Sequence, residues 1–451
     1  MSLCGVPKIH SSDTIFALAT APGRAALAVV RLSGPRASEI LAAMAGKIPE
    51  ARRATLTKIC DPWSGQIIDY ALIYWFPGPA SFTGEDCVEF SIHGSRAILA
   101  KLYEVLGQFP ATRMATPGEF SRRALMNGKM SLIEVESLAD LISAETEQQR
   151  LLGIDGLSGR FRSAVDGWRQ SLLDALVHVE CALDFSDEVD VRAFDSDHIV
   201  QICRSVCESL TEWLGNRERA SLLRNGFTVL ISGPPNVGKS TLLNELAQRD
   251  VAIISDVPGT TRDLIEVRLD LDGHLINLVD SAGVRETSDR IESIGIAKAL
   301  TCGVEADLIL WLSDKAERLE PPKEFEGRSI WLIFTKCDGP DLDGSSLKDA
   351  EGILHISART GFNIAELLKR LASFVASSVS VQGDVVAVNE RQSVALENAR
   401  EVLQTVVHGI EYPEVVAAKL QEAVFEMQVV VGQVAAEEVL DEVFSRFCIG
   451  K

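Results

Sequence analysis

The chain has 451 residues, enough for about three domains, and its 46% hydrophobic and 24% charged residues are typical of globular proteins with sizeable cores. Its formal net charge of −20 excludes a nucleic-acid footprint over the whole chain but leaves room for a local basic patch. Nine scattered cysteines, with no repeated CxxC and no His/Cys cluster, favour reduced thiols over a disulfide framework or a zinc site.

The first segment, residues 1–128, has the pattern of an α+β domain. Strands are expected where apolar and β-branched residues cluster, at residues 14–19, 25–32, 70–76 and 87–93. A helix is expected at residues 95–106, and residues 116–119 have the composition of a turn. This pattern alone assigns no chemistry to the domain.

Some polar residues of the first segment are candidates for ligand contacts. Arg31, Glu89 and His93 lie inside or beside the predicted strands, where a surface or structural role is the commoner one. Arg122 and Arg123 form a small basic spot, for which a solvated helix face is the favoured interpretation on residue type alone.

Two helical segments, residues 129–220 and 381–451, flank a central domain at residues 221–380. Apolar residues with a period near 3.6 predict helices at residues 131–142, 151–182, 199–214, 391–407 and 414–431. Neither segment looks like a complete bundle, so we expect the central domain to be inserted into one discontinuous helical domain. Cys203 and Cys207 can share a helix face and are interpreted as core residues.

The chain ends in the sequence FCIGK, which does not fit a prenylation box. A frayed tail is the ordinary interpretation, but aromatic residues and the thiol of Cys448 are unusual at a solvated end. A buried or site-lining tail is therefore an open alternative. We find no N-terminal targeting signal and no apolar run that could span a bilayer, so we expect a cytoplasmic protein without a membrane partner.

A phosphate-binding loop follows the buried apolar run at residues 227–231. Gly233, Gly238, Lys239 and Ser240 have the P-loop spacing, and an amphipathic helix follows, so strand, loop and helix stand in the required order. The glycines let backbone N–H groups wrap a phosphate, and the helix N-terminus adds partial positive charge. We expect Lys239 to reach the β- and γ-phosphates and the Ser240 hydroxyl to bind Mg²⁺.

The central domain has the order of a doubly wound α/β sheet with its loops at the carboxyl ends of the strands. A hairpin turn is expected at residues 272–273. Strands are expected at residues 265–271, 274–279, 308–312, 330–334 and 353–356.

Each loop of this domain has a chemical task. Asp280 can hold Mg²⁺ through water, and Gly283 leaves room for its N–H to meet a γ-phosphate. A threonine near residue 261 can complete the Mg²⁺ shell only when that phosphate is present, which makes its loop a switch. Asp338, in the sequence TKCD, can accept the N1–H and N2–H of guanine. Adenine has no such donor pair, so the site favours GTP over ATP.

The group that activates water differs from that of Ras-like enzymes. Those enzymes place a glutamine directly after the glycine of the DxxG loop, and this chain has Val284 there, so hydrolysis requires another group. Arg285, Glu286 and Glu292 lie within reach in the sequence. No arginine is placed to act in cis, and the side-chain oxygen of Asn236 can instead bind an inorganic monovalent cation.

Together these residues resemble one family closely, the tRNA-modification GTPase MnmE, also called TrmE. The resemblance covers the whole chain through ATAPGRAALAVVRLSG, SFTGEDCVEF, ATPGEFSRRALMNGK, the nucleotide loops and the FCIGK end. It implies a multidomain protein. The implied N-terminal domain has an α+β tetrahydrofolate-binding-like fold and forms the dimer contact. The implied α-helical domain is discontinuous in the sequence. A Ras-like α/β P-loop GTPase domain is inserted into it.

The resemblance also implies an activity. It implies a K⁺-stimulated GTP hydrolase that uses a tetrahydrofolate one-carbon unit, as 5-formyl- or 5,10-methylene-tetrahydrofolate. With a flavoprotein partner, MnmG, which supplies FAD and NADH chemistry, it installs an aminomethyl or carboxymethylaminomethyl group on C5 of the wobble uridine (U34) of certain tRNAs. The implied assembly is a homodimer that forms a heterotetramer with the flavoprotein. In the family, the two GTPase domains swing together when GTP and K⁺ are bound.

Site residues are carried over from the family by motif. Arg31, Glu89, Lys129 and Lys451 would contact the folate, with Cys448 near them, and Glu292 would orient the attacking water. Glu292, Lys239 and Cys448 are the expected catalytic residues. The expected Mg²⁺ ligands are Ser240 and Thr261, and the expected K⁺ ligands are Asn236, Ser255, Val257 and Thr260. The expected nucleotide-binding residues are Asn236, Val237, Gly238, Lys239, Ser240, Thr241, Ser255, Asp256, Val257, Pro258, Gly259, Thr260, Thr261, Asp280, Ser281, Ala282, Gly283, Thr335, Lys336, Asp338, Ser357, Ala358 and Arg359.

Two positions depart from the family pattern. Thr335 stands where the family mostly has asparagine, and its hydroxyl can still bridge to the phosphate loop, so we expect GTP selectivity with weaker affinity. Ser281 stands where threonine is usual. We expect this substitution to be harmless, because the backbone of the residue and not its side chain acts in the loop. A regulatory GTPase switch, such as a ribosome-assembly G protein, is the alternative function, and it would have no need for a one-carbon ligand site.

Overall fold

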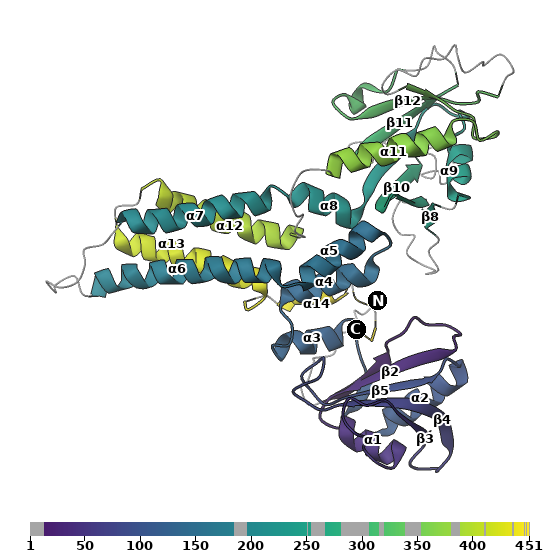
Figure 1. Ribbon diagram of the computed structural model, residues 1–451, viewed down its shortest axis with the longest axis vertical. Helices are drawn as coiled ribbons and strands as arrows, with labels where there is room; N and C mark the ends of the chain where they lie inside the picture. Colours follow the sequence, from purple (N-terminus) through teal and green to yellow (C-terminus); the bar gives the residue numbers. More distant parts are fainter. Residues whose placement is uncertain are drawn as a thin grey trace, which may run out of the picture. The chain divides into compact units, whose positions relative to one another are not determined.

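The computed structural model describes residues 13–184, 196–249, 251–253, 267–280, 306–314, 320–338, 353–379, 388–409, 412–434, 437–445, 447 and 449–450. The chain divides into two compact units, both visible in Figure 1. Unit 1 comprises Met1–Ala139, Arg162–Gln170 and Val424–Lys451, and unit 2 comprises Asp140–Phe161 and Ser171–Ala423. The predicted boundaries at residues 128, 220 and 380 stay a prediction.

Unit 1 contains a six-stranded sheet in the order β3-β4-β5-β2-β1-β6. Neighbouring strands are antiparallel except for the parallel pair of β1 and β6. The strands are β1 (Thr14–Leu18), β2 (Leu27–Ser33), β3 (Thr55–Cys60), β4 (Ile67–Phe76), β5 (Cys87–His93) and β6 (Thr112–Met114). The four predicted strands are confirmed, whereas β3 and β6 were not expected.

Two helices, α1 (Ala37–Ala45) and α2 (Arg96–Gln108), supply the apolar layer on one face of this sheet. Ile40 of α1 and Leu102 of α2 join Phe90 of β5 in a fully buried cluster. The predicted helix at residues 95–106 is confirmed as α2, and α1 was not expected.

The opposite face of the sheet carries exposed apolar side chains. Leu56, Tyr70 and Leu72 are 69%, 59% and 38% exposed. They are neighbours on one face, because Leu56 pairs with Leu72 across β3 and β4 and Tyr70 lies two residues earlier on β4. These three side chains form an exposed apolar patch. At β1 this face is covered, because Phe120 of α3 (Glu119–Met126) is buried there against Ile15.

A buried ion-pair network fixes α3 in unit 1. The Glu119 carboxylate, which is 1% exposed, contacts Arg113 at 2.7 Å and Arg123 at 3.0 Å. Arg123, which is 3% exposed, also contacts Glu85 at 3.1 Å. The favoured interpretation of Arg123 as a residue of a solvated helix face is therefore wrong, because its guanidinium neutralises two carboxylates in the interior.

The C-terminal residues pack on the same helix. Arg122 Nη1 contacts Asp441 Oδ1 of α14 (Glu437–Ser445) at 2.6 Å, so this arginine is also paired. Phe444 and Phe447 are buried in a cluster with Val135. The described part of the tail is therefore packed in unit 1 and is not frayed.

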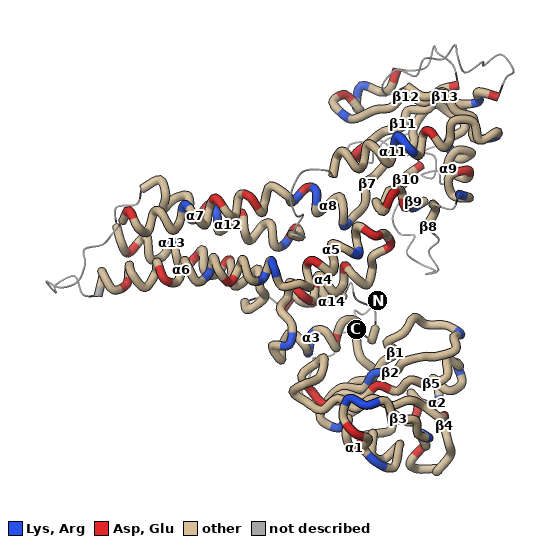
Figure 2. The backbone as a smooth tube through the Cα atoms, in the orientation of Figure 1, with Lys and Arg blue, Asp and Glu red and all other residues tan. Residues whose placement is uncertain are grey.

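The predicted helices are present with shifted ends. They are α4 (Leu132–Ser143), α5 (Glu147–Leu157), α6 (Arg160–Asp184), α7 (Ser196–Leu214), α12 (Glu390–Val407) and α13 (Pro413–Val431). Helices α8 (Arg217–Asn225) and α14 were not expected. The continuous helix predicted at residues 151–182 is wrong, because the chain turns between α5 and α6 at Gly159, whose φ is +79°. Lys and Arg are interspersed with Asp and Glu along α6, α7 and α12 (Figure 2).

Helices from the two halves of the sequence lie side by side in unit 2. Helix α7 precedes the α/β sheet in the sequence and α12 follows it, yet they pack along each other (Figure 1). This confirms the inserted arrangement. Cys203 and Cys207 are buried on α7 as expected, and burial raises the pKa of the Cys203 thiol to about 12. None of the helices that the structure describes combines the length and apolarity needed to cross a bilayer.

The central α/β sheet has the order β13-β12-β11-β7-β10-β9-β8. Strands β13, β12, β11, β7 and β10 are parallel, and β9 is antiparallel to both of its neighbours. The elements are β7 (Phe227–Ser232), α9 (Lys239–Ala247), β8 (Ala252–Ile253), β9 (Val267–Leu271), β10 (His274–Asp280), β11 (Leu308–Ser313), η2 (Lys323–Phe325), β12 (Ile330–Phe334), β13 (Ile353–His355) and α11 (Ile364–Val379). The expected doubly wound sheet is confirmed.

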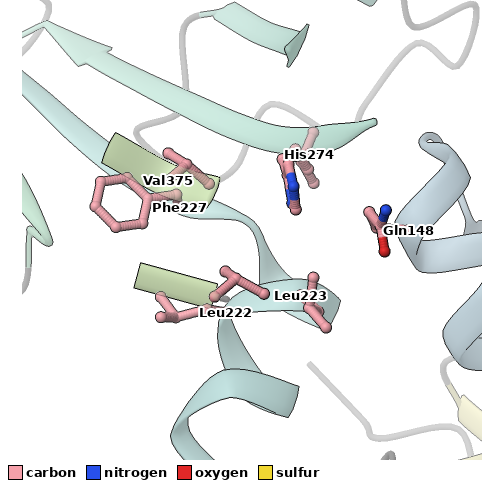
Figure 3. Close-up of a pocket in the computed structure, with 8 residues that line it drawn as sticks. Gln148, Leu222, Leu223, Phe227, His274 and Val375 are labelled. Carbon is pink, nitrogen blue, oxygen red and sulfur yellow. The ribbon is translucent and has the colours of Figure 1, made fainter. Parts of the chain in front are cut away.

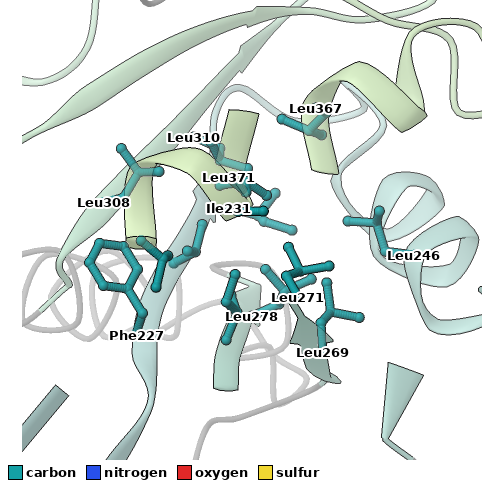
Figure 4. Packing of buried hydrophobic residues seen from close by; sticks show 14 of the residues in the cluster. Phe227, Ile231, Leu246, Leu269, Leu271, Leu278, Leu308, Leu310, Leu367 and Leu371 are labelled. Atoms are coloured by element: carbon teal, nitrogen blue, oxygen red, sulfur yellow. The ribbon is translucent and has the colours of Figure 1, made fainter. Parts of the chain in front are cut away.

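One core holds the sheet to its helices. Leu246 of α9 and Leu371 of α11 pack with Ile231 of β7 and Leu278 of β10, and each of these side chains is fully buried (Figure 4). This packing fixes the strand ends from which the loops of the site emerge.

The predicted turn between β9 and β10 is confirmed. Asp272 and Gly273 have φ values of +53° and +84°, the left-handed conformations that a tight hairpin turn uses.

Glu119 gives the first testable prediction. Burial disfavours its carboxylate, but hydrogen bonds from Arg113 and the Thr116 N–H, together with the Arg123 charge, outweigh burial and hold the pKa of Glu119 below its ordinary value. The Glu119→Gln variant removes the buried charge that Arg113 and Arg123 both contact, so we expect the free energy of unfolding at pH 7 to fall by about 3 kcal/mol. Urea unfolding followed by circular dichroism measures this.

The same experiment has a pH dependence and a control. A carboxyl with a depressed folded pKa stabilises the protein above its unfolded pKa of about 4.3 and loses this contribution as the pH falls through the folded value. The difference between Glu119→Gln and the unaltered protein should therefore shrink below about pH 4. Glu104→Gln, at an exposed pair with Lys101, should unfold like the unaltered protein. Equal stability of both variants at pH 7 would contradict the role of the network.

Candidate functional site

The phosphate loop joins β7 to α9 with the geometry that the sequence predicts. A Cβ at Gly233 would lie 2.3 Å from the carbonyl oxygen of Leu312 on β11, so this position accepts glycine alone. Gly238 precedes the first residue of α9 with a φ of +103°. Lys239 is buried, and its Nζ donates to the carbonyls of Gly233 at 2.8 Å and Pro234 at 3.0 Å. The loop therefore wraps around the ammonium group that a phosphate would contact.

The two predicted magnesium-binding groups on described residues lie in contact. Ser240 Oγ donates to Asp280 Oδ2 at 3.1 Å. Asp280 is the last residue of β10 and pairs in register with Ile231 of β7, which brings its carboxylate to the loop. Hydroxyl and carboxylate oxygens are ligands that Mg²⁺ prefers, so the donor set fits this ion.

Thr335 bridges the guanine loop to the phosphate loop. Its Oγ1 donates to the carbonyl oxygen of Val237 at 2.6 Å, and the bond is buried. The sequence predicted this bridge, and it is confirmed. Thr335 follows the last residue of β12, and its N–H donates to the carbonyl oxygen of Ser313 at the end of β11 at 2.8 Å, so the ends of two strands meet the phosphate loop at this position.

The predicted guanine-binding carboxylate is held by its neighbours. Ser357 Oγ, after β13, donates to Asp338 Oδ1, and Ser357 also accepts the Thr360 N–H at 3.1 Å. Lys336 has a φ of +60°, and its Nζ contacts Asp314 Oδ2 at 3.0 Å. Asp314 was not expected from the sequence, although its place directly after β11 was the available signal.

A second polar cluster lies on the sheet of unit 1. Arg31 and Glu89 are direct partners across β2 and β5, and their side chains pair at 2.8 Å. The Arg31 guanidinium lies 5.1 Å from the ring centre of Phe82 and 5.7 Å from that of Phe120. The structure therefore brings Arg31 and Glu89 together as the resemblance implies. The two rings were not expected, although Phe82 is part of the SFTGEDCVEF motif.

Lys129 lies beside the loop that carries Phe82. A Cβ at Gly84 would be 3.3 Å from Lys129 Cγ, so this side chain runs along that loop. His93, the third polar candidate, pairs instead with Asp69 at 2.8 Å.

The described end of the chain reaches the same sheet. Ile449 bridges to Pro117, and a Cβ at Gly450 would lie 2.0 Å from the carbonyl oxygen of Leu18. Leu18 adjoins Ala17, the register partner of Arg31 on β2. The C-terminal residues therefore approach the strands that carry the Arg31 cluster.

Many predicted site residues lie outside the described part of the chain, and their roles stay predictions. These are Ser255, Asp256, Val257, Pro258, Gly259, Thr260, Thr261, Ser281, Ala282, Gly283, Glu292, Cys448 and Lys451. The substitution at Val284 lies there too, as do Arg285 and Glu286.

Two family models match the chain. The model described as "MnmE helical domain" matches residues 132–448, and "GTP-binding protein TrmE N-terminus" matches residues 14–129. The chain is 45% identical over 439 residues to the tRNA modification GTPase MnmE of Beijerinckia indica, covering 97% of this chain and 96% of that protein. It is 45% identical over 447 residues to the protein of the same name from a Methylobacterium species, covering 98% of this chain and 100% of that protein.

Parts of the chain are similar to solved structures. Era from Aquifex aeolicus, bound to GDP and AlF4⁻, is 25% identical and covers 41% of this chain and 69% of that chain. The TM-score is 0.26, a value too low to establish a shared overall fold.

Thr335 gives the second testable prediction. The Thr335→Val variant keeps the shape of the side chain but leaves the buried Val237 carbonyl without its donor, a loss of about 1 kcal/mol or more. We expect the dissociation constant for GTP to rise roughly 5- to 20-fold, as measured with a fluorescent GTP analogue. Thr405→Val, at an exposed position on α12, is the matched control and should bind like the unaltered protein. Unchanged affinity in Thr335→Val would refute the bridging role.

Proposed function

The chain belongs to the MnmE family of tRNA modification GTPases, and on that premise we propose that it is stimulated by K⁺ and uses a folate one-carbon unit. It is a GTP hydrolase that acts in tRNA modification. In the proposed reaction, a flavoprotein partner of the MnmG type supplies FAD and NADH chemistry. The two proteins together place an aminomethyl or carboxymethylaminomethyl group on C5 of the wobble uridine (U34).

The observation that carries the proposal is the Arg31 cluster in unit 1. A reduced pterin has a flat ring with neighbouring N–H donors, and its glutamate tail carries carboxylates. Glu89 can accept such donors, Arg31 can pair with an anion, and the Phe82 ring offers an apolar surface beside them. A regulatory switch would have no use for this set of groups, which supports the one-carbon chemistry over that alternative.

Residues of the C-terminal tail extend the proposed folate site. The approach of Gly450 to Leu18 supports a role for its neighbours Lys451 and Cys448 beside the ligand. Lys129 would contribute a second cation from the loop side. We assign these residues to ligand binding and leave the chemical role of the Cys448 thiol to direct test.

The proposed cation site rests on Asn236. This residue lies in the phosphate loop with a φ of +61° and an exposed side chain, so its carbonyl oxygen is available to an ion. A monovalent cation there would neutralise charge on the leaving phosphate oxygens, which is the task of an arginine in other GTPases. Ser255, Val257 and Thr260 would complete the K⁺ shell, Ser240 and Thr261 would hold Mg²⁺, and Glu292 would orient water.

The exposed face of the unit 1 sheet supports homodimer formation. Leu56, Tyr70 and Leu72 lie on the face that also carries Glu89, because Tyr74 of the same β4 face pairs with Glu89 of β5. A second copy on this face would bury the apolar patch and shield the folate from water. We further propose a cytoplasmic heterotetramer with the flavoprotein. That partner would share the contact with tRNA, since this chain has a net charge of −20.

The third prediction tests the cation. GTP turnover by the full-length protein should be roughly tenfold or more faster in K⁺ than in Na⁺ at equal ionic strength, because only an ion of the right size fits the proposed site. The Asn236→Ala variant should lose this difference while it still binds GTP. Choline chloride serves as the control for ionic strength. Equal turnover in K⁺ and Na⁺ would remove the cation from the mechanism.

The fourth prediction tests the one-carbon site. Calorimetric titration of the full-length protein with 5-formyl-tetrahydrofolate should give a saturable heat of binding. The Arg31→Ala variant loses a charged contact of about 1.5–3 kcal/mol, so affinity should fall roughly 10- to 100-fold. Arg53→Ala removes an exposed arginine of the same unit and should bind like the unaltered protein. No binding heat to the unaltered protein would favour a regulatory switch.

A further inference from the structure

The β9–β10 hairpin runs from the nucleotide site to helix α5 within unit 2. At one end, Asp280 of β10 accepts the hydrogen bond from Ser240 in the phosphate loop at 3.1 Å. Strand β10 is hydrogen-bonded on both sides, to β7 and to β9. Its seven residues make a stiff element about 20 Å long. A displacement at Asp280 therefore reaches the turn at the other end of the strand.

The turn of the hairpin binds the first turn of α5. The helix begins after its N-cap Thr146, which forms a capping box with Gln149. Gln148 has one of the N–H groups that no helix can satisfy internally, and it donates to the carbonyl oxygen of Gly273 at 3.1 Å. The hairpin turn is thus part of the cap of α5.

An ion pair joins the same two elements. Arg268 Nη1 of β9 contacts both carboxylate oxygens of Glu145 at 2.9 Å. Glu145 lies two residues before α5, and its N–H donates to the Gln149 side chain at 2.8 Å, so its backbone is fixed to the helix. The arginine is therefore attached to the start of the helix and not to a loose chain.

The packing beside these bonds contains a small void. A cavity of about 10 Å³ lies between Gln148 of α5, His274 of β10, Leu222 of α8 and Val375 of α11, and Figure 3 shows these side chains around it. His274 Nδ1 is buried, with no hydrogen-bond partner among the described residues, and burial lowers the pKa of this imidazole. Close-packed interiors have few such gaps, so the hairpin and α5 pack less tightly beside these bonds than an ordinary protein interior does.

We propose that the contact of the β9–β10 hairpin with α5, made by the Arg268–Glu145 ion pair and the Gln148–Gly273 hydrogen bond, couples the nucleotide site to the helical part of the chain. Arg268 and Glu145 act as positioning residues, and neither contacts the nucleotide loops described above. The inference goes beyond the K⁺ and folate proposals and depends on neither of them, since it requires only a bound guanine nucleotide.

Hydrogen exchange measures the coupling directly. The full-length protein is compared with GDP and with a non-hydrolysable GTP analogue, and exchange is followed at the amides of residues 146–150 and 270–276. We expect the Gln148 amide to exchange at least threefold differently in the two states. In Arg268→Glu this difference should disappear. No nucleotide-dependent change at Gln148 in the unaltered protein would overturn the proposal.

A charge exchange tests the functional consequence. Arg268→Glu should hydrolyse GTP within twofold of the unaltered protein, while the modified nucleoside in tRNA from cells carrying the variant falls at least fivefold. The double variant Arg268→Glu, Glu145→Arg restores the pair and should recover at least half of the modification. Failure of the double variant to recover, or full modification in the single variant, would refute the coupling role.

A matched control separates coupling from stability. Arg150→Glu reverses a charge on the same helix, where Arg150 pairs with Glu147 and both are exposed. It should leave tRNA modification within twofold of normal. Thermal unfolding of all variants is measured, and a loss of modification that follows the melting temperature, with no loss of the exchange signal at Gln148, would count against the proposal.

Discussion

The nucleotide site depends on the register of parallel strands. Strands β10, β7, β11, β12 and β13 run in one direction, so their carboxyl ends meet at one edge of the sheet. A slip of one residue between β7 and β10 would turn Asp280 away from Ser240. The buried side chains of α9 and α11 oppose such a slip, because they fit the sheet in one register. The hydrophobic core therefore sets the position of every polar group at this edge.

Much of this site could be predicted because its information is local in the sequence. The phosphate loop, the Asp280 position and the Thr335–Asp338 loop are short patterns that follow predicted strands. Even the bond from Thr335 to Val237 followed from the reach of a hydroxyl at that place. The contact between Asp314 and Lys336 could not be predicted, since an acidic residue at a strand end has no distinctive spacing.

The N-terminal unit was harder to predict for a physical reason. Its key contacts join residues far apart in the sequence, such as Arg123 with Glu85 and Phe120 with Arg31. A charged side chain usually faces water, so Arg123 was placed on a solvated face, and only the folded structure identifies its buried partners. Edge strand β3 was missed because its sequence, TLTKIC, has no regular alternation of apolar and polar residues. The residue pattern named Arg31, Glu89 and His93 as candidates, and the family resemblance then placed Arg31 and Glu89 in one ligand site without His93.

The division of the chain into units has a consequence for synthesis on the ribosome. Unit 1 is assembled from residues at both ends of the sequence, and Phe444 and Phe447 are among its buried side chains. The hydrophobic surface around α3 and Val135 therefore lacks its last covering residues until the whole of unit 2 has been translated. A slow codon late in the message would lengthen the interval during which that surface is exposed to other unfolded chains.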